Sequence, residues 1–142
     1  MLKTILLGTA LFFSHVLLVS ASSPEDLAAE CVSSVHRLVD RYETDAASST
    51  RECIRKINAL QGAGREEAAV QVARSCVTEA TRKAALVGET IQSICDRCTN
   101  ELVNLGAFGL ARRVDAACDE SLEQLRAILE RQKEAIAAAL AD

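Results

Sequence analysis

Six cysteines and two glycine-containing breaks constrain the fold of this chain more than any other feature. The breaks are the segments Gly62-Ala63-Gly64 and GAFG, residues 106–109. An even number of cysteines indicates a disulfide framework in an exported chain and a metal or redox site in a cytosolic one. The N-terminal segment therefore decides how the cysteines are interpreted. They are widely spaced: Cys31, Cys53, Cys76, Cys95, Cys98 and Cys118.

Residues 1–21 have the pattern of a secretory signal peptide. Lys3 precedes an apolar run from Ile5 to Val19, and Val19-Ser20-Ala21 fits a signal-peptidase site. The run is short for a membrane span. We therefore expect a secreted, extracellular protein with no membrane association, whose single domain spans residues 22–142 and contains three disulfides.

Apolar and small residues recur every three or four positions along most of this domain, which is the spacing of one helix face. The first run begins at Pro24 and ends at the first glycine break, the second ends at GAFG, and the third continues from Leu110 almost to the C-terminus. Sustained alternation with β-branched residues is absent, so strands are not expected. The sequence predicts an all-α fold: an elongated antiparallel bundle of three long helices, or of four if the first is broken near Ser48.

The cysteine positions test this topology, because two residues of an antiparallel hairpin are level when their midpoint lies at the turn. The midpoint of Cys53 and Cys76 is 64.5, beside Gly64. The midpoint of Cys31 and Cys98 is also 64.5. Two disulfides therefore fit a single hairpin that reverses at the first glycine break.

The same reasoning applies to the second hairpin. The midpoint of Cys95 and Cys118 is 106.5, beside Gly106. An alternative in which Cys95 and Cys98 exchange partners stays open, because these two residues lie one helical turn apart. The favoured pairs are Cys31–Cys98, Cys53–Cys76 and Cys95–Cys118, and the alternative pairs Cys31 with Cys95 and Cys98 with Cys118.

Other chemistry is poorly supported by the residues. A redox C-x-x-C pair stands at a helix start after a strand, and neither surrounds Cys95 and Cys98. Zinc would need two further ligands, yet His36 is the only histidine after the signal peptide. With one histidine, nucleophilic catalysis lacks a credible base. We therefore expect no enzymatic activity, no cofactor and no metal.

The charge of the domain also narrows the partners. Removing Lys3 from 16 basic residues leaves 15, against 20 acidic residues. A net negative chain has no general affinity for nucleic acid or for anionic membranes. The regular steps of Ala and Val should close the core, which disfavours a cavity for a carried ligand. The oligomeric state is not predicted by these features.

Two groups of surface residues are candidates for binding a protein partner. Phe108 is an aromatic residue beside arginines at a turn, which is typical of a binding hot spot; alternatively, Phe108 and Leu110 fold under the bundle and cap its end. A second basic group lies on the first helix; such a group is more often a solvated face, here one that pairs with Glu52. The first group comprises Phe108, Leu110, Arg112 and Arg113, and the second Arg51 and Arg55.

The signal peptide, the acidic helical composition and the cysteine positions resemble those of small secreted insect proteins. The likeness is to anopheline salivary proteins of the anophensin and albicin type. The stretch RYETDAASSTREC and the segment CDESLEQL also resemble the TsetseEP-type domain of midgut proteins. Neither resemblance carries binding residues over to this chain.

The two resemblances imply different functions. The salivary one implies a protein that enters a host during blood feeding and binds plasma proteins there. Its partners would be components of the alternative complement convertase or contact-system factors of the kallikrein-kinin pathway, which it would inhibit. The midgut one implies a secreted structural protein or a carrier of small apolar ligands.

Overall fold

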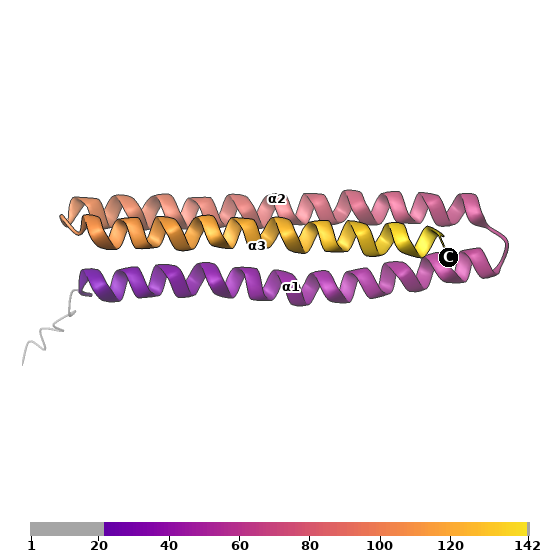
Figure 1. Cartoon of the computed structure of the whole chain (residues 1–142), viewed down its shortest axis with the longest axis horizontal. Coiled ribbons are helices and arrows are strands. Elements are labelled where there is room, and N and C mark those ends of the chain that lie inside the picture. Colours follow the sequence, from indigo (N-terminus) through magenta and orange to yellow (C-terminus); the bar gives the residue numbers. More distant parts are fainter. Residues whose placement is uncertain (1–21, 142) are drawn as a thin grey trace, which may run out of the picture.

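The computed structural model describes residues 22–141, which form three long antiparallel α-helices (Figure 1). These are α1 (Pro24–Gly62), α2 (Glu66–Asn104) and α3 (Phe108–Ala141). At 1.5 Å per residue, they are about 50 to 60 Å long. The predicted elongated three-helix bundle is confirmed, and the predicted signal peptide lies outside the described residues.

The helix α1 is continuous, so the four-helix alternative is wrong. It starts with a capping box, in which Ser23 and Asp26 each accept a hydrogen bond from the other's backbone N–H, with Pro24 in the first turn. At the suspected break, the hydroxyls of Ser49 and Thr50 donate to the carbonyl of Ala46. These side chains bond back onto the helix, a geometry that bends a helix without ending it.

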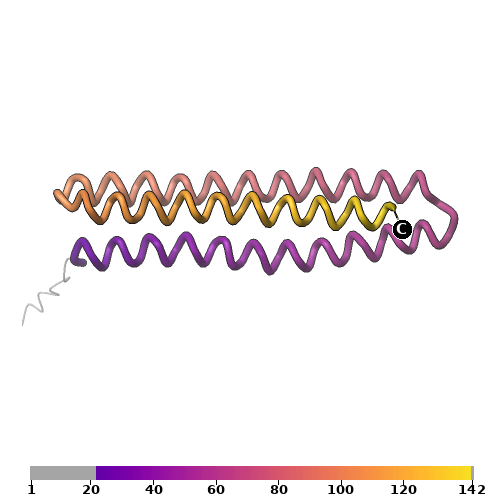
Figure 2. Tube along the Cα trace, in the orientation of Figure 1, coloured from indigo at the N-terminus to yellow at the C-terminus, as the bar shows by residue number. Residues whose placement is uncertain are grey.

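Both connections reverse the chain through a glycine with positive φ. Gly64 has φ +70° and Gly106 has φ +73°, a conformation that side chains with a Cβ rarely adopt. The N–H of Arg65 donates to the carbonyl of Leu60 in the first turn. In the second turn, the N–H of Ala107 donates to the carbonyl of Leu102 in the same way. These are Schellman motifs, which satisfy the last carbonyls of α1 and α2. The traces in Figure 2 show the two reversals at opposite ends of the rod.

The second turn is shorter than predicted. The sequence places Phe108 and Gly109 in the turn, but both belong to the first turn of α3. The carbonyl of Ala107 accepts hydrogen bonds from the N–H groups of Leu110 and Ala111, which starts the helix.

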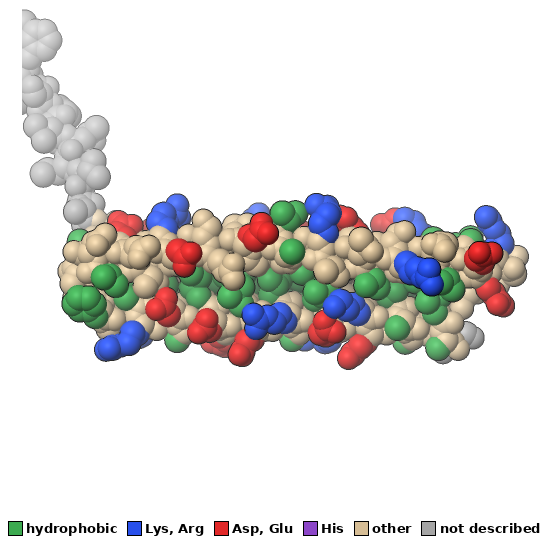
Figure 3. Space-filling view, turned by 90° about the horizontal axis from the view of Figure 1, so that it is seen from above, with side chains coloured by type: hydrophobic (Ala, Val, Ile, Leu, Met, Phe, Trp, Pro, Cys, Tyr) green, Lys and Arg blue, Asp and Glu red, His purple; other side chains and the backbone are tan. Residues whose placement is uncertain are grey.

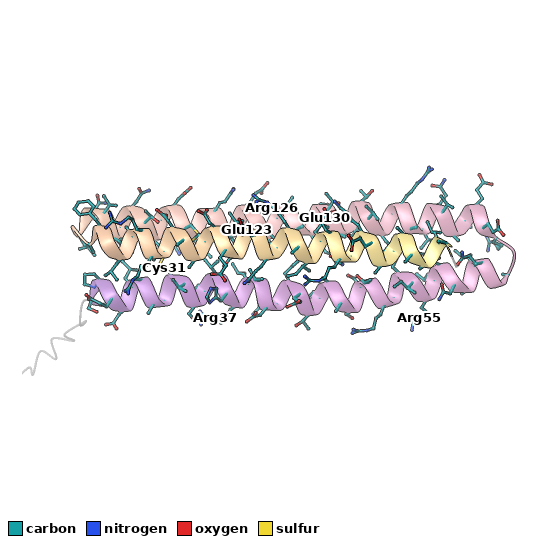
Figure 4. The ribbon with its side chains drawn as sticks, viewed as in Figure 1. Cys31, Arg37, Arg55, Glu123, Arg126 and Glu130 are labelled. Atoms are coloured by element: carbon teal, nitrogen blue, oxygen red, sulfur yellow. A yellow bond between two sulfur atoms is a disulfide. The ribbon has the colours of Figure 1, made fainter. Side chains whose placement is uncertain are left out.

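The three disulfides join the pairs favoured by the register. Cys31–Cys98 and Cys53–Cys76 connect α1 to α2 and have Cα–Cα distances of 6.3 and 6.4 Å. The third bond connects α2 to α3 with a Cα–Cα distance of 6.3 Å. The third bond is Cys95–Cys118, so the alternative in which Cys95 and Cys98 exchange partners is not found. Cys31 extends from α1 toward the other helices (Figure 4).

Buried side chains form two apolar clusters along the rod. The larger cluster runs from Ala28 to Ala46 on α1 and includes Ile91, Leu102 and Val114 from the other helices. The smaller cluster lies toward the α1–α2 turn and contains only six buried residues: Cys53, Ile57, Ala69, Ala73, Ile136 and Ala139. The rod therefore packs less apolar side-chain volume toward the α1–α2 turn.

The surface carries charges of both signs, as Figure 3 shows for one face, where hydrophobic side chains gather along the middle of the rod. Within residues 22–141 no helix is long and apolar enough to cross a membrane.

Candidate functional site

An exposed apolar patch surrounds the α2–α3 turn. Leu105 and Phe108 are 56% and 59% exposed, and Val103 is 41% exposed. These are three of the four exposed large hydrophobic residues of the described chain. Figure 3 shows hydrophobic side chains at the left-hand end of the rod, where this turn lies. Exposed apolar residues that gather in one place mark an interaction surface, whereas single ones are ordinary.

Two predicted arginines lie beside this patch. Phe108 and Arg112 are four residues apart on α3, so they share a helix face. Arg112 and Arg113 are exposed, and neither forms a salt bridge with a carboxylate of residues 22–141. We name this set the end patch; it consists of Val103, Leu105, Phe108, Arg112 and Arg113.

The alternative prediction, that Phe108 and Leu110 fold under the bundle and cap its end, is correct for Leu110 and wrong for Phe108. Leu110 is partly buried and packs against the larger apolar cluster. Phe108 stays exposed. Leu110 is therefore a packing residue that anchors the start of α3, and Phe108 is free to contact a partner.

The second predicted group lies elsewhere. Arg51 and Arg55 are exposed on α1, and Arg55 extends away from α2 and α3 (Figure 4). They are separated from the α2–α3 end by more than 25 residues of α1, or about 40 Å along the rod. Glu52 is occupied by Lys56, with an Nζ–Oε1 distance of 2.8 Å. This face is a solvated helix surface, and the structure does not bring it together with the end patch.

A groove of about 900 Å³ lies between α1 and α2 and extends from the middle of the rod toward the α1–α2 turn. Its walls run from Leu38 to Lys56 on α1 and from Gln71 to Val87 on α2, about 27 Å along α1. The expectation that Ala and Val close the bundle is wrong on this side. The reason is the small size of the residues from both helices that line the groove, among them Ala46, Ser49, Ser75 and Ala80.

The floor of the groove contains a buried hydrogen-bond network on α3 and α1. The Tyr42 hydroxyl donates to Gln132 Oε1 at 3.0 Å. Gln132 Nε2 donates to the Ala46 carbonyl at 3.1 Å and to Thr50 Oγ1 at 3.0 Å, with Ser49 Oγ at 3.5 Å. We name Tyr42, Ser49, Thr50 and Gln132 the polar network. It stands between the two apolar clusters, and it satisfies the hydrogen-bonding groups of the buried amide.

Burial raises the pKa of Tyr42 above the usual value of 10.0, since the surrounding apolar atoms disfavour the phenolate. The phenol therefore stays protonated over the physiological range and keeps donating to Gln132.

The rim of the groove is charged but balanced. It has three basic and three acidic side chains. The Lys56 ammonium lowers the pKa of Glu52, chiefly through a hydrogen bond, and Arg82 lowers that of Glu79 in the same way. Glu79 also lies 3.8 Å from Lys83. The six rim residues are Arg41, Asp45, Glu52, Lys56, Glu79 and Lys83.

Comparison with known proteins found no match to any protein-family model, to any curated protein or to any solved structure.

Several residues of these sites were not among the predicted candidates. Leu105 stands at the helical spacing of the second run, but it follows the last residue of α2 and is exposed. Val103 falls between the apolar positions that recur at helical spacing in the second run, so the sequence alone indicates that it is exposed. The position of Gln132 is also informative in the sequence, because it falls between Ile128 and Ile136 at helical spacing, where an apolar core residue is expected.

Proposed function

We propose that this chain is a secreted salivary protein that docks its end patch on a host plasma protein and so inhibits a protease cascade during blood feeding. The cascade is the alternative complement pathway or contact activation of the kallikrein-kinin system. The proposed partners are convertase components or contact-system factors. The choice of cascade rests on the resemblance to anopheline salivary proteins of the anophensin and albicin type.

The observation that carries this proposal is the exposure of Leu105 and Phe108 at the tip of a disulfide-linked rod. Hot spots of protein interfaces are enriched in aromatic residues and arginine, and most of the binding energy comes from a few such residues. Cys95 lies ten residues before Leu105, and Cys118 lies ten residues after Phe108. A patch fixed in this way loses little conformational entropy when it binds, which favours affinity.

The mode of inhibition follows from the shape. A protease-mimicking inhibitor presents an extended loop to an active site, whereas both turns here are short and closed by Schellman motifs. We therefore propose that the rod blocks a cascade by occupying a surface of an assembled complex. No catalytic step is needed for this function.

The test is inhibition of the two cascades in host plasma by the mature secreted protein. Alternative-pathway haemolysis and kallikrein generation are measured over a range of concentrations up to micromolar, alongside retention of plasma proteins on the immobilised protein. We expect one cascade to be inhibited. The double variant Leu105→Ser/Phe108→Ser should lose about 30-fold in potency, which corresponds to about 2 kcal/mol of binding free energy.

Leu86→Ser is the matched control, since Leu86 is also a large exposed residue of the bundle, at 49%, but lies far from the end patch. It should inhibit as well as the wild-type protein, and so should Arg51→Ser/Arg55→Ser. No inhibition of either cascade at micromolar concentration would refute the function. Equal potency of the end-patch variant and the wild type would refute the assignment of the surface.

One observation favours a second candidate, the secreted carrier of small apolar ligands implied by the midgut resemblance. It is the groove between α1 and α2, since a carrier needs a space that its ligand can fill.

A further inference from the structure

The groove between α1 and α2 has the composition of a small-molecule site. Such sites are mostly apolar, hold a few convergent polar groups, and have volumes of about 300 to 1,000 Å³. The walls of this groove of about 900 Å³ include Leu38, Val72 and Val87, and its floor holds Ile136 beside the polar network. The groove thus combines an apolar lining with hydrogen-bonding groups gathered at one place.

The width of the groove indicates whether its occupant is a slender molecule or a helix of another protein. The Cys53–Cys76 bond lines the groove and holds the two Cα atoms 6.4 Å apart. An α-helix with its side chains is about 10 to 12 Å across, so a helix of a partner or of a second copy cannot enter between α1 and α2 there. The groove nevertheless reaches Gln132 and Ile136 on α3. Only a slender molecule can use this depth.

The charges around the groove favour a neutral occupant. Three basic and three acidic side chains line it, and Glu52 and Glu79 are each close to a lysine. A buried carboxylate or phosphate would need an uncompensated cation to offset its lost hydration. The six rim charges sum to zero, so a charged headgroup meets no net charge of opposite sign here.

The polar network indicates which functional group the occupant carries. The Ser49 and Thr50 hydroxyls already donate to the Ala46 carbonyl, so their protons are used. A hydroxyl oxygen has two acceptor lone pairs, and Ser49 is exposed to the groove with only a long contact of 3.5 Å from Gln132 Nε2. A ligand that brings a hydrogen-bond donor would find an acceptor here.

We propose that this groove binds a neutral, elongated, largely apolar small molecule that carries one hydrogen-bond donor, such as a long-chain alcohol. The apolar walls cover the hydrocarbon part, and Ser49 accepts the ligand's hydrogen bond. This inference deepens the second candidate function, the carrier, and rests on it. It does not depend on docking by the end patch, since none of the end-patch residues lines the groove.

The test uses N-phenyl-1-naphthylamine, a neutral fluorescent probe with one N–H donor. We expect saturable binding to the mature protein with a stoichiometry of one. Its anionic relative 8-anilinonaphthalene-1-sulfonate should bind at least about tenfold more weakly, because the groove lining has no net positive charge to offset the lost hydration of the sulfonate. Dodecan-1-ol should displace the neutral probe, and dodecanoate of the same chain length should not at pH 7.

Two matched variants locate the site. Ser49→Phe places a large side chain in the groove and should weaken probe binding by about tenfold or more. Ala47→Phe makes the same addition two residues away, at an exposed position that does not line the groove, and should leave binding within about twofold of the wild type. Circular dichroism and disulfide mapping confirm that both variants fold.

Three results would overturn the inference. The first is no saturable binding of the neutral probe by the wild-type protein. The second is an equal effect of Ser49→Phe and Ala47→Phe. The third is a dimer, seen by light scattering, that Ser49→Phe dissociates, since the groove would then be an interface between copies. Cascade inhibition through the end patch would survive all three.

Discussion

The two halves of the rod are built differently. Toward the α2–α3 turn, Cys31–Cys98 and Cys95–Cys118 tie all three helices together within a few residues, around the larger apolar cluster. Toward the α1–α2 turn, one disulfide joins α1 to α2 only, and α3 is held there by the smaller cluster and the polar network. The half with more disulfides and the larger apolar cluster carries the exposed end patch, and the groove extends from the middle of the rod into the other half.

This difference teaches how a helical rod with almost no aromatic residues can offer two kinds of surface. An exposed apolar tip needs a rigid base, because ordering it on binding would cost free energy. A groove needs incomplete packing, which is tolerable where a disulfide prevents the helices from separating. The following changes, in decreasing order of expected effect, break or sharpen this contrast.

The largest effect should come from removing single disulfides. Cys53–Cys76 and Cys95–Cys118 both close a sequence separation of 23 residues, so the chain-entropy contribution is the same, about 3 kcal/mol each. We expect Cys53→Ala/Cys76→Ala and Cys95→Ala/Cys118→Ala to lower the free energy of unfolding in urea by similar amounts.

Hydrogen exchange should separate the two variants. Loss of the Cys53–Cys76 bond should raise amide exchange mainly in the segment from Cys53 to Cys76, because nothing else joins the helices covalently in that half. Loss of Cys95–Cys118 should leave this segment protected. If both variants exchanged uniformly along the rod, the two halves would not differ in stability as described.

A smaller effect is expected at the polar network where the halves meet. Gln132→Leu leaves the buried Tyr42 hydroxyl without its partner and should cost about 1 to 3 kcal/mol of unfolding free energy. Replacing both partners by apolar groups can be nearly neutral, so Tyr42→Phe/Gln132→Leu should recover much of the loss. Urea denaturation of the two single variants and the double variant gives the coupling energy. Additive losses would show that the hydrogen bond couples the two residues negligibly.

The smallest expected effect is a loss of stability at alkaline pH through Tyr42. The folded pKa of Tyr42 is raised, so the folded state binds this proton more tightly than the unfolded state. The contribution of this group to stability is fully present below pH 10.0, the usual tyrosine pKa, and is lost as pH rises through the folded pKa. The wild-type protein should lose stability as the pH rises above 10.0, and Tyr42→Phe should lose less. Brief thermal melts across this range measure it, and identical pH profiles would contradict the assignment.

Helix number and disulfide pairing could be predicted because both depend on distances along the chain. Gly64 and Gly106 mark the reversals, and the cysteine midpoints coincide with them, so no knowledge of side-chain packing was needed. Tyr42 stands at the helical spacing of the first run and is buried, which the spacing alone indicates.

The groove and the start of α3 could not be predicted in this way. The groove depends on which faces of α1 and α2 meet, since Ser49 and Ala80 leave space only when they face the same side of the bundle. The role of Gln132 depends on contacts across about 90 residues of sequence, 90 to Tyr42 and 86 to Ala46. Phe108 is a candidate from the sequence alone. That Phe108 is exposed whereas Leu110 is partly buried depends on how the start of α3 packs on the other helices.

The central claim is that the rod carries two independent binding surfaces, and a crossed assay tests it most directly. Leu105→Ser/Phe108→Ser and Ser49→Phe are each measured for inhibition of the plasma cascade and for binding of N-phenyl-1-naphthylamine. We predict that the end-patch variant loses inhibition and keeps probe binding, and that the groove variant does the reverse. Loss of both activities in either variant would contradict the claim and indicate one shared surface.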